Sequence, residues 1–286
     1  MTGPVRIGVV GIGALSLRGI LPHLTQEDVR DRVRVQALCD PVHERVSATA
    51  TQFGVPAAYA SIEELLEDEA IDAVSIASPI GFHFEHCRLA LEAGKHVHVN
   101  KTLCTTVAEA DILIALAGEK GLALVPSPGE VLRPQLRRAR QLIESGTIGR
   151  LSWAICGGAF GRYHEDDEPE RVGSPGGITI DPSWYFRKPG GGPMYDITVY
   201  SLHQLTSVLG TARSVAALSG VLVPEREFQG RTIATDADDN TVLLLDFGGS
   251  RFAVVHGTAA GGRLGAIRSC CVPRHEGDDR RRAARR

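Results

Sequence analysis

Residues 5–16 read Val-Arg-Ile-Gly-Val-Val-Gly-Ile-Gly-Ala-Leu-Ser, and this stretch decides the fold of the first part of the chain. Its first six residues are typical of a short, mostly apolar strand, and the glycine turn that follows opens a helical pattern through Leu24. In that context Gly11 permits a tight turn, and Gly13 lets the main chain approach a pyrophosphate at the helix N-terminus. Ser16 takes the third glycine position, which requires only a small side chain. The stretch therefore predicts a dinucleotide-binding turn formed by Gly11, Ile12, Gly13 and Ala14.

Strands and helices alternate along the chain up to about residue 125. Further strands are expected at 33–39, 73–77, 96–99 and 122–125, and helices at 41–52, 62–68, 82–93 and 107–120. Ser61 and Glu64 have the spacing of a capping box at the start of one of these helices. This alternation predicts an α/β fold in which residues 1–125 form a Rossmann domain with a doubly wound parallel sheet.

The pattern changes after Pro126. One helix is expected at 131–145, followed by longer alternating segments around 150–160, 213–223, 240–247 and 251–258. Glycine- and proline-rich stretches separate these segments, which is typical of an α+β domain with an open, mainly antiparallel sheet. We assign this domain to residues 126–262. Residues 263–286 are expected to form an irregular, arginine-rich tail, because hydrophobic periodicity fades there.

The overall charge excludes some classes of partner. The 286 residues carry a formal net charge of −3, so no global field attracts nucleic acid or an anionic membrane surface. No apolar run approaches the roughly 20 residues of a membrane span, and the N-terminus lacks the pattern of a signal peptide. We therefore expect a cytoplasmic protein whose partner is a small molecule.

The sequence lacks the usual patterns of metal ligands. Its six cysteines include no C-x-x-C pair, which favours free and mostly buried thiols over a zinc site or a redox dithiol. His83, Glu85 and His86 form only a loose cluster, which a helix face or the edge of a cofactor site explains better than a metal does. The sequence therefore predicts no metal centre.

Asp40 ends the strand expected at 33–39, at the position where a Rossmann fingerprint places the carboxylate that binds a ribose 2′-hydroxyl. A carboxylate there repels a 2′-phosphate, so the sequence favours NAD over NADP as the dinucleotide. Arg45 lies nearby and keeps NADP as an alternative, because an arginine at this place accommodates a 2′-phosphate.

Two strand ends are expected to surround the nicotinamide. Ser78 and Pro79 follow strand 73–77, and Asn100 and Lys101 follow strand 96–99, at the carboxyl edge where open α/β sheets bind ligands. His83 lies at the edge of the same region. Partial desolvation there suits the amine of Lys101 for proton transfer with a hydroxyl, or for holding that oxygen. The alternative is a solvated surface lysine.

A second cluster of polar residues follows a glycine-rich loop at 190–192. Asp196, Tyr200 and His203 are spaced i, i+4 and i+7, so they share one face of the expected helix. A carboxylate and a phenol one turn apart can orient a substrate hydroxyl and relay its proton. His203 is the alternative proton carrier, because histidine titrates near neutral pH. A second alternative is that Tyr200 simply packs in the core of an amphipathic helix.

Several stretches together carry a family resemblance. They are the Gly-Ile-Gly-Ala-Leu-Ser turn, Asp40, Ala-Ser-Pro-Ile-Gly-Phe-His at 77–83, Glu-Ala-Gly-Lys-His-Val-His-Val-Asn-Lys-Thr at 92–102 and Gly-Gly-Gly-Pro-Met-Tyr-Asp-Ile-Thr-Val-Tyr at 190–200. In order and spacing they resemble the glucose–fructose oxidoreductase, inositol dehydrogenase and rhizopine-catabolism (Gfo/Idh/MocA) family over about residues 3–262. The resemblance implies a Rossmann domain followed by a domain whose open sheet commonly mediates homodimers or homotetramers.

The same resemblance implies an NAD(P)-dependent oxidoreductase. Such an enzyme transfers a hydride between nicotinamide and a secondary alcohol or carbonyl of a sugar, cyclitol or related polyol. Family members commonly carry the motif D-x-G-x-H, in which the histidine is catalytic. Others have tyrosine at the histidine position, and in this chain Tyr200 occupies it. Tyr200 would be the acid or base, Lys101 would polarise the substrate oxygen, and Asp196 would orient the substrate. Trp184, stacked on the sugar, and His203 would complete the substrate site, although Trp184 also fits a core position.

Two departures from the family leave alternatives open. The usual Glu-Lys-Pro motif is Asn100-Lys101-Thr102 here, so the lysine is kept and the proline that shapes the neighbouring backbone is lost. Family members usually continue for several strands after 257–262, where this chain has its arginine-rich stretch, and a shortened sheet would expose an edge. The alternatives are a dinucleotide-binding protein with impaired catalysis and an NAD-dependent glycoside hydrolase of the same family.

Overall fold

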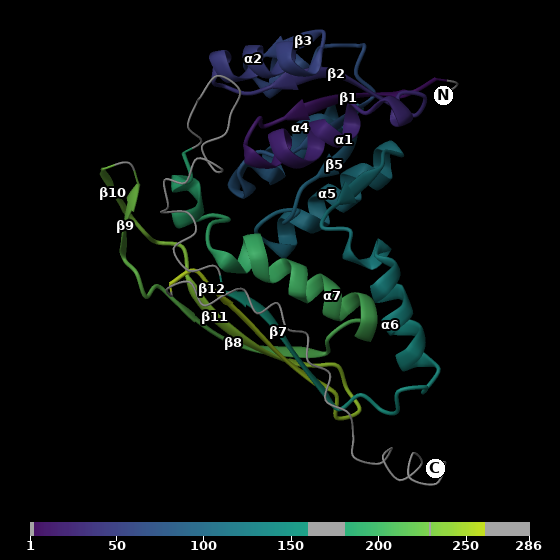
Figure 1. The fold of residues 1–286 in the computed structure, drawn as a ribbon, viewed down its shortest axis with the longest axis vertical. Helices are drawn as coiled ribbons and strands as arrows, with labels where there is room; N and C mark the ends of the chain where they lie inside the picture. The colour runs from purple at the N-terminus through teal and green to yellow at the C-terminus, as the bar shows by residue number, and fades with distance from the viewer. Residues whose placement is uncertain (1–2, 160–180, 229, 261–286) are drawn as a thin grey trace, which may run out of the picture. The chain divides into compact units, whose positions relative to one another are not determined.

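The structure is a computed structural model that describes residues 3–159, 181–228 and 230–260 (Figure 1). Contacts within the chain divide it into two units. The first holds the described residues of 1–127, 164–191 and 227–233, and the second holds those of 128–163, 192–226 and 234–286. The first change of unit follows Ser127, close to the boundary expected at residue 125. Residues 181–191, 227–228 and 230–233 join the first unit although they lie far beyond that boundary.

A six-stranded parallel sheet forms the centre of the first unit, with the strand order β3-β2-β1-β4-β5-β6 (Figure 1). The strands are β1 (Val5–Val10), β2 (Val33–Cys39), β3 (Ala57–Tyr59), β4 (Ala73–Ile76), β5 (His96–Val99) and β6 (Leu124–Pro126). This order is that of a doubly wound Rossmann fold, whose topological switch point lies between β1 and β4. The fold predicted for this part of the chain is therefore confirmed. The short strand β3 was not predicted.

Helices pack on both faces of this sheet. They are α1 (Leu21–Leu24), α2 (His43–Phe53), α3 (Ile62–Leu66), α4 (His83–Glu92) and α5 (Val107–Lys120). The helices α3, α4 and α5 cover one face, where the buried side chains include Leu65, Ile76, Leu91, Val97 and Leu113. The helices α1 and α2 cover the other, where they include Val9, Leu21, Leu38, Val46 and Ala50. Alternate residues of β1, such as Val9 and Val10, belong to different clusters, as the pleat of a strand requires.

Local signals set the ends of these helices. Ser61 accepts a hydrogen bond from the main-chain N–H of Glu64 at 3.3 Å, as its position ahead of α3 predicts. Thr106 and Glu109 form a full capping box at the start of α5. The helical pattern after the glycine turn differs from the expectation in one respect, because Ser16–Ile20 is a π-helical stretch (η1) ahead of α1.

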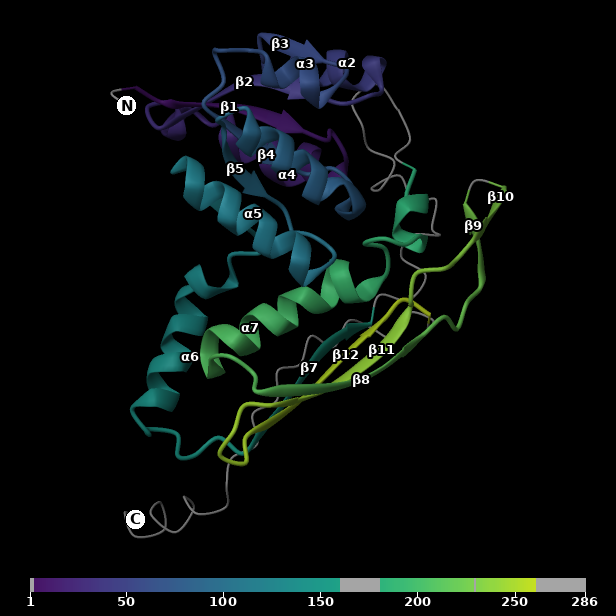
Figure 2. The same ribbon diagram turned by 180° about the vertical axis from the view of Figure 1, so that it is seen from behind.

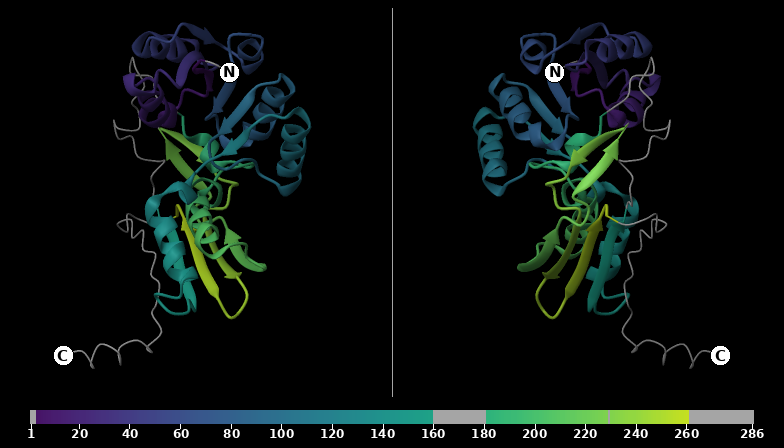
Figure 3. Two further views of the ribbon diagram at one scale, coloured as in Figure 1. Left: turned by 90° about the vertical axis from the view of Figure 1, so that its right-hand side faces the viewer. Right: turned by 90° about the vertical axis from the view of Figure 1, so that its left-hand side faces the viewer.

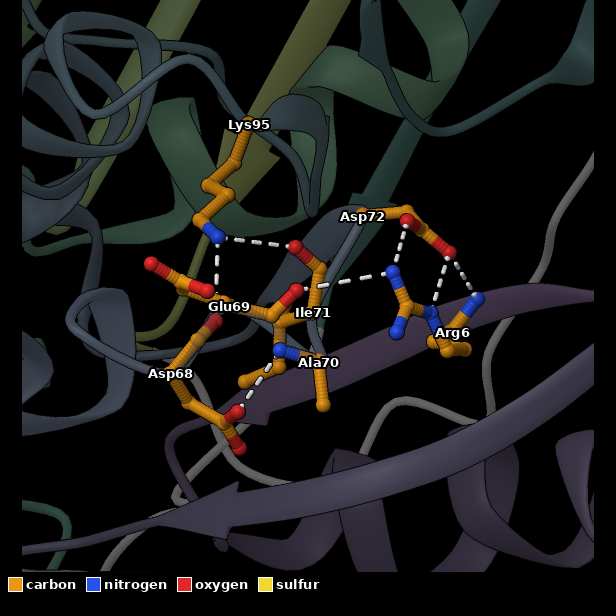
Figure 4. A network of polar contacts seen from close by, with 7 residues as sticks. All are labelled: Arg6, Asp68, Glu69, Ala70, Ile71, Asp72 and Lys95. Atoms are coloured by element: carbon orange, nitrogen blue, oxygen red, sulfur yellow. Dashed lines mark hydrogen bonds and ion pairs between the residues drawn. The ribbon is translucent and has the colours of Figure 1, made fainter. Parts of the chain in front are cut away.

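Charged side chains fix the turn that precedes β4 (Figure 4). Arg6 on β1 donates to both carboxylate oxygens of Asp72, from Nη2 at 2.7 Å and from Nε at 2.9 Å. The Nζ of Lys95 donates to the main-chain oxygens of Asp68 at 3.0 Å and of Ile71 at 2.8 Å. Hydrogen bonding to the Arg6 guanidinium lowers the pKa of Asp72 to about 2. These contacts join β1, the 68–72 turn and the residue before β5.

The second unit contains a four-stranded sheet with the order β7-β12-β11-β8. Its strands are β7 (Trp153–Ala159), β8 (Ser214–Gly220), β11 (Asn240–Asp246) and β12 (Phe252–Thr258). β11 pairs antiparallel with both β8 and β12, whereas β12 and β7 are parallel. The prediction of a mainly antiparallel sheet is confirmed, with one parallel pair. A separate two-stranded sheet of β9 (Glu225–Phe228) and β10 (Arg231–Ala234) was not predicted.

One face of the four-stranded sheet is covered by α7 (Val199–Leu209). Figure 2 shows this helix beside the strands, and Figure 3 shows the strands from two further sides. The side chains buried between the helix and the sheet include Cys156, Leu205, Leu243, Leu245 and Val255. The helix α6 (Pro134–Glu144) packs beside α7. It begins three residues later than predicted, because Glu130–Leu132 forms a 3-10 turn and Arg133, which precedes a proline, is extended.

Four of the six cysteines lie within the described residues, where Cys39, Cys87, Cys104 and Cys156 are buried and form no disulfide. Burial raises the pKa of the Cys39 and Cys87 thiols to about 12, so these two are inert near neutral pH. The predicted tail at 263–286, with Cys270 and Cys271, lies outside the described residues.

In the described part of the chain there is no group of three or more His, Cys, Asp or Glu suited to a metal ion. None of the helices described is long and apolar enough to cross a membrane.

Candidate active site

The glycine turn follows β1 and packs against the main chain just after β4. Gly11 has a φ of +88°, and a Cβ placed on it would lie 2.6 Å from the main-chain N of Ser78. Only glycine fits there, because both the conformation and the close approach exclude a side chain. A Cβ on Gly13, by contrast, would meet nothing within 4 Å. The side of the turn next to the helix start is thus open, as a dinucleotide-binding turn requires, and the residues present fit that group.

Asp40 holds the glycine turn in place. Its Oδ2 accepts from the main-chain N–H of Ile12 at 2.8 Å, and its Oδ1 accepts from that of Val42 at 2.9 Å. Arg45 donates to the same Oδ1 at 2.6 Å, and the two side chains are only 4% and 13% exposed. The guanidinium of Arg45 is therefore paired with the carboxylate of Asp40. Sequence reasoning placed both residues near the ribose and missed this structural role, because it depends on a contact between residues 28 positions apart.

The loops after β4 and β5 are joined through His83. Its Nδ1 lies 2.6 Å from the main-chain oxygen of Thr102, and its Nε2 lies 2.8 Å from that of Ser78. Lys101, adjacent to Thr102, is buried, with 8% of the residue exposed, so the alternative of a solvated surface lysine does not describe its position. Asn100 continues the sheet by donating its main-chain N–H to Ile76 at 2.8 Å. The structure thus brings the predicted residues at the ends of β4 and β5 together.

Two further features belong to the loop after β4. Pro79 precedes the short 3-10 turn Ile80–Phe82 (η3), which leads into α4. The hydroxyl of Ser78 lies 3.0 Å from Nδ1 of His86, whose ring stacks on Phe82 with centroids 5.8 Å apart. Burial lowers the pKa of His86, and the neighbouring His83 lowers it further. His86 therefore orients Ser78 as a neutral ring near pH 7.

The aromatic segment at 184–186 belongs to the first unit. Tyr185 and Phe186 are 2% exposed and serve as core, whereas Trp184 is half-buried and meets Tyr185 edge to face at 5.7 Å. The chain then passes the loop after β4, since a Cβ on Gly81 would lie 2.9 Å from the main-chain oxygen of Pro189. Of the three aromatic residues, only Trp184 has surface left to contact a substrate.

In the second unit, Asp196 lies in a π-helical stretch, Met194–Thr198 (η6), and Tyr200 and His203 lie on α7. All three are half-buried. The regular spacing assumed from the sequence therefore applies from Tyr200 to His203 but not across the π-helical stretch, whose turn is wider. The sequence carried no signal for this change of helix type.

Glu130 is a buried polar residue that sequence reasoning missed. It is 1% exposed, and its Oε2 accepts from Nε2 of Gln204 at 2.8 Å. Its main-chain N–H donates to Nδ1 of His203 at 3.3 Å, which leaves the remaining ring proton of a neutral His203 on Nε2. Arg133 forms an ion pair with the carboxylate at 2.9 Å. No sequence signal marks Glu130, which follows a Ser-Pro-Gly segment.

The strand order, the switch point and the glycine turn define a dinucleotide-binding Rossmann unit. A family model described as "Oxidoreductase family, NAD-binding Rossmann fold" matches residues 5–127, and one described as "GFO/IDH/MocA C-terminal domain" matches residues 136–269. The chain belongs to the Gfo/Idh/MocA family of oxidoreductases. The family and its NAD-binding fold, both predicted from the sequence, are thereby confirmed.

Individual relatives agree with this family. An uncharacterized oxidoreductase of Rhizobium meliloti, ORF334, is 30% identical over 253 residues, which are 88% of this chain and 67% of the relative. The dTDP-3,4-didehydro-2,6-dideoxy-alpha-D-glucose 3-reductase of Actinomadura kijaniata is 30% identical over 225 residues, 78% of this chain and 61% of the relative. This chain therefore spans about two thirds of the length of these curated relatives. The structure of levoglucosan dehydrogenase with NADH shares the fold, with a TM-score of 0.72, 23% identity, and coverage of 92% of this chain and 68% of that one.

Proposed function

We propose that this protein is an NAD-dependent oxidoreductase that interconverts a secondary alcohol and a carbonyl of a sugar, cyclitol or related polyol. The observation that carries the proposal is the position of Lys101. It is a buried lysine that follows β5 at the carboxyl edge of a sheet with Rossmann strand order, in the loop that His83 joins to the end of β4. A cation held in this place can bind and polarise a substrate oxygen.

The glycine turn and the strand-end loops are the residues we propose to hold the cofactor. They are Gly11, Ile12, Gly13 and Ala14 with Asp40 on one side, and on the other Ser78, Pro79, Asn100 and Lys101, in the two loops that the enclosed ring of His83 joins. When bound, the nicotinamide supplies the hydride acceptor or donor. We propose NAD as the preferred form, because Asp40 follows β2 at the position where a Rossmann fold places the carboxylate for a ribose 2′-hydroxyl, and the neighbouring Arg45 is already paired with it at 2.6 Å instead of being available to a 2′-phosphate. NADP is the alternative.

Tyr200 is the proposed proton carrier. A phenol is protonated near neutral pH, so Tyr200 can donate a proton to a carbonyl oxygen during reduction, while Lys101 binds that oxygen and Asp196 orients the substrate. The contact of His203 with Glu130 favours Tyr200 over His203 in this role. The lone pair on Nδ1 of His203 is used by the Glu130 N–H, so the ring presents a donor at Nε2 and has no free base. His203 is thus a substrate-binding donor in this proposal.

The proposed substrate class rests on the polar groups and on relatives. Trp184 keeps exposed surface, and an indole face suits the apolar face of a sugar ring. One relative is a reductase of a dTDP-linked deoxysugar, and a protein of the same fold is a dehydrogenase of levoglucosan. Both names describe carbohydrates, so a hydroxyl-bearing ring is the first class to test.

We also propose that the uncovered face of the four-stranded sheet joins copies of the chain in a homodimer or homotetramer. Leu218 and Leu244 are 76% and 58% exposed on this face, where Leu218 is paired with Val242 across the strands. Leu244 lines a hollow together with Trp153 and Phe252. An exposed apolar face around a central strand is better explained by contact with another protein surface than by exposure to water.

A cofactor and substrate screen tests the proposal. NAD and NADP are added separately, the shift in melting temperature is measured, and sugars and polyols are then screened for absorbance of reduced nicotinamide. We expect NAD to stabilise the protein more than NADP, and at least one polyol to give turnover. Stabilisation without turnover on any compound would favour a binding protein with impaired catalysis. Net hydrolysis of a glycoside without accumulation of reduced cofactor would favour the glycoside hydrolase.

Replacing Lys101 by alanine should lower kcat by roughly 10² to 10⁴, because the substrate oxygen loses its charged partner. The NAD-induced shift in melting temperature should remain, because the glycine turn is untouched. Lys120→Ala is the matched control, since this lysine lies at the exposed end of α5 in the same unit. Undiminished turnover in Lys101→Ala would show that the catalytic assignment is wrong.

A further inference from the structure

His83 is the first residue of α4, and the protein encloses it completely, with 0% exposed. Its two ring nitrogens lie 2.6 and 2.8 Å from the main-chain oxygens of Thr102 and Ser78. A carbonyl oxygen accepts but never donates, so each contact is a hydrogen bond only when that nitrogen carries a proton. The neutral ring supplies one such proton and the imidazolium supplies two.

The two carbonyls belong to different loops. Ser78 lies just after β4, and Thr102 follows Lys101 after β5. The main-chain ladder between these strands ends with the 2.8 Å bond from Asn100 to Ile76. The ring therefore links the loops beyond the point where the ladder stops, and one end of the link is the residue next to Lys101.

We propose that His83 is a positioning residue whose Nδ1–H bond to Thr102 fixes the main chain that carries Lys101, and whose protonation at Nε2 adds a second bond to Ser78. This inference rests on the proposed role of Lys101. The single proton of the neutral ring is assigned to Nδ1 because the contact with Thr102 is the shorter of the two. A fully enclosed ring cannot itself reach the substrate, so His83 acts through the loops.

Charge around the ring decides when the second bond forms. Burial lowers the pKa of His83 below its usual value of 6.5, the bonds to Thr102 and Ser78 raise it, and the charge of Lys101 lowers it again. Within the described residues, the titratable groups that face the ring are Lys101, from the loop after β5, and His86, one turn further along α4. The ring is therefore neutral at physiological pH. The bond to Ser78 forms only when the pH falls below the ordinary histidine pKa of 6.5, because Nε2 then gains a proton.

Nuclear magnetic resonance of the nitrogen-15-labelled protein tests the hydrogen bonds without any turnover, and the ring signals are assigned by comparison with His83→Asn. At pH 7.5 we expect a proton on Nδ1 alone, and a second proton on Nε2 as the pH is lowered towards 5. A ring protonated only on Nε2 at pH 7.5, or one that does not change down to pH 5, overturns the proposal. This measurement uses the unmodified protein and decides the question even if the variants fold poorly.

Two substitutions separate the two bonds. The amide of Asn lies near the position of Nδ1 and that of Gln near Nε2, so His83→Asn keeps a donor for Thr102 and His83→Gln keeps one for Ser78. With NAD and the polyol that gives turnover in the screen, we expect His83→Asn to keep kcat within about threefold. We expect His83→Gln to lower kcat roughly 10- to 100-fold with a smaller change in KM, because Lys101 is displaced rather than removed.

The matched control is His98→Gln. The ring of His98 also uses both nitrogens, with Ser75 at 2.9 Å and Ser127 at 3.1 Å, but it contacts neither strand-end loop at Lys101. We expect a lower melting temperature and an unchanged kcat. Equal losses of kcat in the two His83 variants, or no loss in either, overturn the proposal. Undiminished turnover in Lys101→Ala would instead overturn the proposed function and leave the resonance measurement to decide the bonds of His83.

Discussion

The two larger sheets of the described residues differ in how their faces are covered. Helices pack on both faces of the parallel sheet in the first unit. In the second unit, α7 covers one face of the four-stranded sheet, and the other presents exposed apolar side chains such as Leu218 and Leu244. The central strand β11 nevertheless has a nearly continuous apolar run, Thr-Val-Leu-Leu-Leu, which is typical of a strand buried on both sides.

The comparison separates what each unit needs in order to be stable. The first unit buries its strands within its own fold and ties the strand-end loops together through Gly11, Asp40 and His83. Among its described residues, the second unit has a core on one face of its sheet only, so we expect the other face to be covered by a second copy of the chain. The predictions that follow test this difference, beginning with the largest expected effect.

Neighbouring leucines on β11 give the sharpest comparison of the two faces. Leu243 is 6% exposed in the core, whereas Leu244 is 58% exposed on the opposite face. Leu243→Ala should lower the free energy of unfolding by about 2 to 5 kcal/mol, because it leaves a cavity. Leu244→Ala should lower it by less than about 0.5 kcal/mol in single chains. Urea unfolding at low protein concentration measures both values.

The same pair reports on the proposed oligomer. At higher concentration, Leu244→Ala should shift sedimentation towards single chains, because it removes contact area between copies. Leu243→Ala serves as the control for a general loss of stability. Equal losses from both substitutions at low concentration would contradict a sheet with one covered face. Sedimentation unaffected by Leu244→Ala would contradict the assignment of this face to the oligomer.

Substitutions of two glycines in the first unit distinguish an effect on the stability of the fold from an effect on cofactor binding. Gly11→Ala should lower the free energy of unfolding by about 1 to 3 kcal/mol, because its φ of +88° is strained for alanine and its Cβ would press on Ser78. Gly13→Ala should change it by less than about 1 kcal/mol, since its Cβ meets nothing within 4 Å. It should weaken NAD binding roughly tenfold, which corresponds to about 1.4 kcal/mol.

Urea unfolding and titration with NAD measure the two effects separately. Gly19→Ala is a suitable control within the same helical segment, since its Cβ would make only an ordinary contact, at 3.5 Å, with Leu15. If Gly13→Ala bound NAD as tightly as the unmodified protein, the pyrophosphate would not approach this turn, and the assignment of the cofactor site would be wrong.

Local patterns made much of the fold predictable. The strands β1, β2 and β5 and the helix α5 have the bounds that hydrophobic periodicity predicted, because each is bordered by a turn or a capping residue. The strands β3, β9 and β10 were missed, since β3 has only three residues and the charged residues of β9 (Glu-Arg-Glu-Phe) and β10 (Arg-Thr-Ile-Ala) leave little apolar periodicity. The π-helical stretch around Asp196 was missed because helix type there depends on packing rather than on residue spacing.

The candidate site was predictable in its residues but not in its contacts. Lys101 could be located because it follows a strand that periodicity defines. The partners of Asp40 and His83 could not be predicted, since they lie 28 and 19 residues away in the chain and meet only when the parallel strands assemble. Glu130 had no sequence signal because its burial is created by α7. The roles of Tyr200 and Asp196 remain proposals.

The smallest expected effect concerns the ion pair between Arg6 and Asp72 in the first unit. The pKa of Asp72 in the folded protein is lowered to about 2, against about 3.9 when unfolded. The ion pair with Arg6 therefore stabilises the protein above about pH 4, and this contribution is lost as the pH falls towards 2. Arg6 is 42% exposed, so solvent screens the pair and the contribution should stay below about 1 kcal/mol.

Unfolding of the unmodified protein and of Asp72→Asn at several pH values measures this contribution. We expect the difference between the two proteins to be constant above about pH 5, to shrink between pH 4 and 2, and to fall in 1 M salt because the Debye length is then only about 3 Å. A difference of several kcal/mol, unaffected by salt, would mean that charged ties, rather than helices packed on both faces, stabilise the first unit. A small, salt-sensitive difference would leave apolar packing as the main source of its stability, in contrast to the half-covered sheet of the second unit.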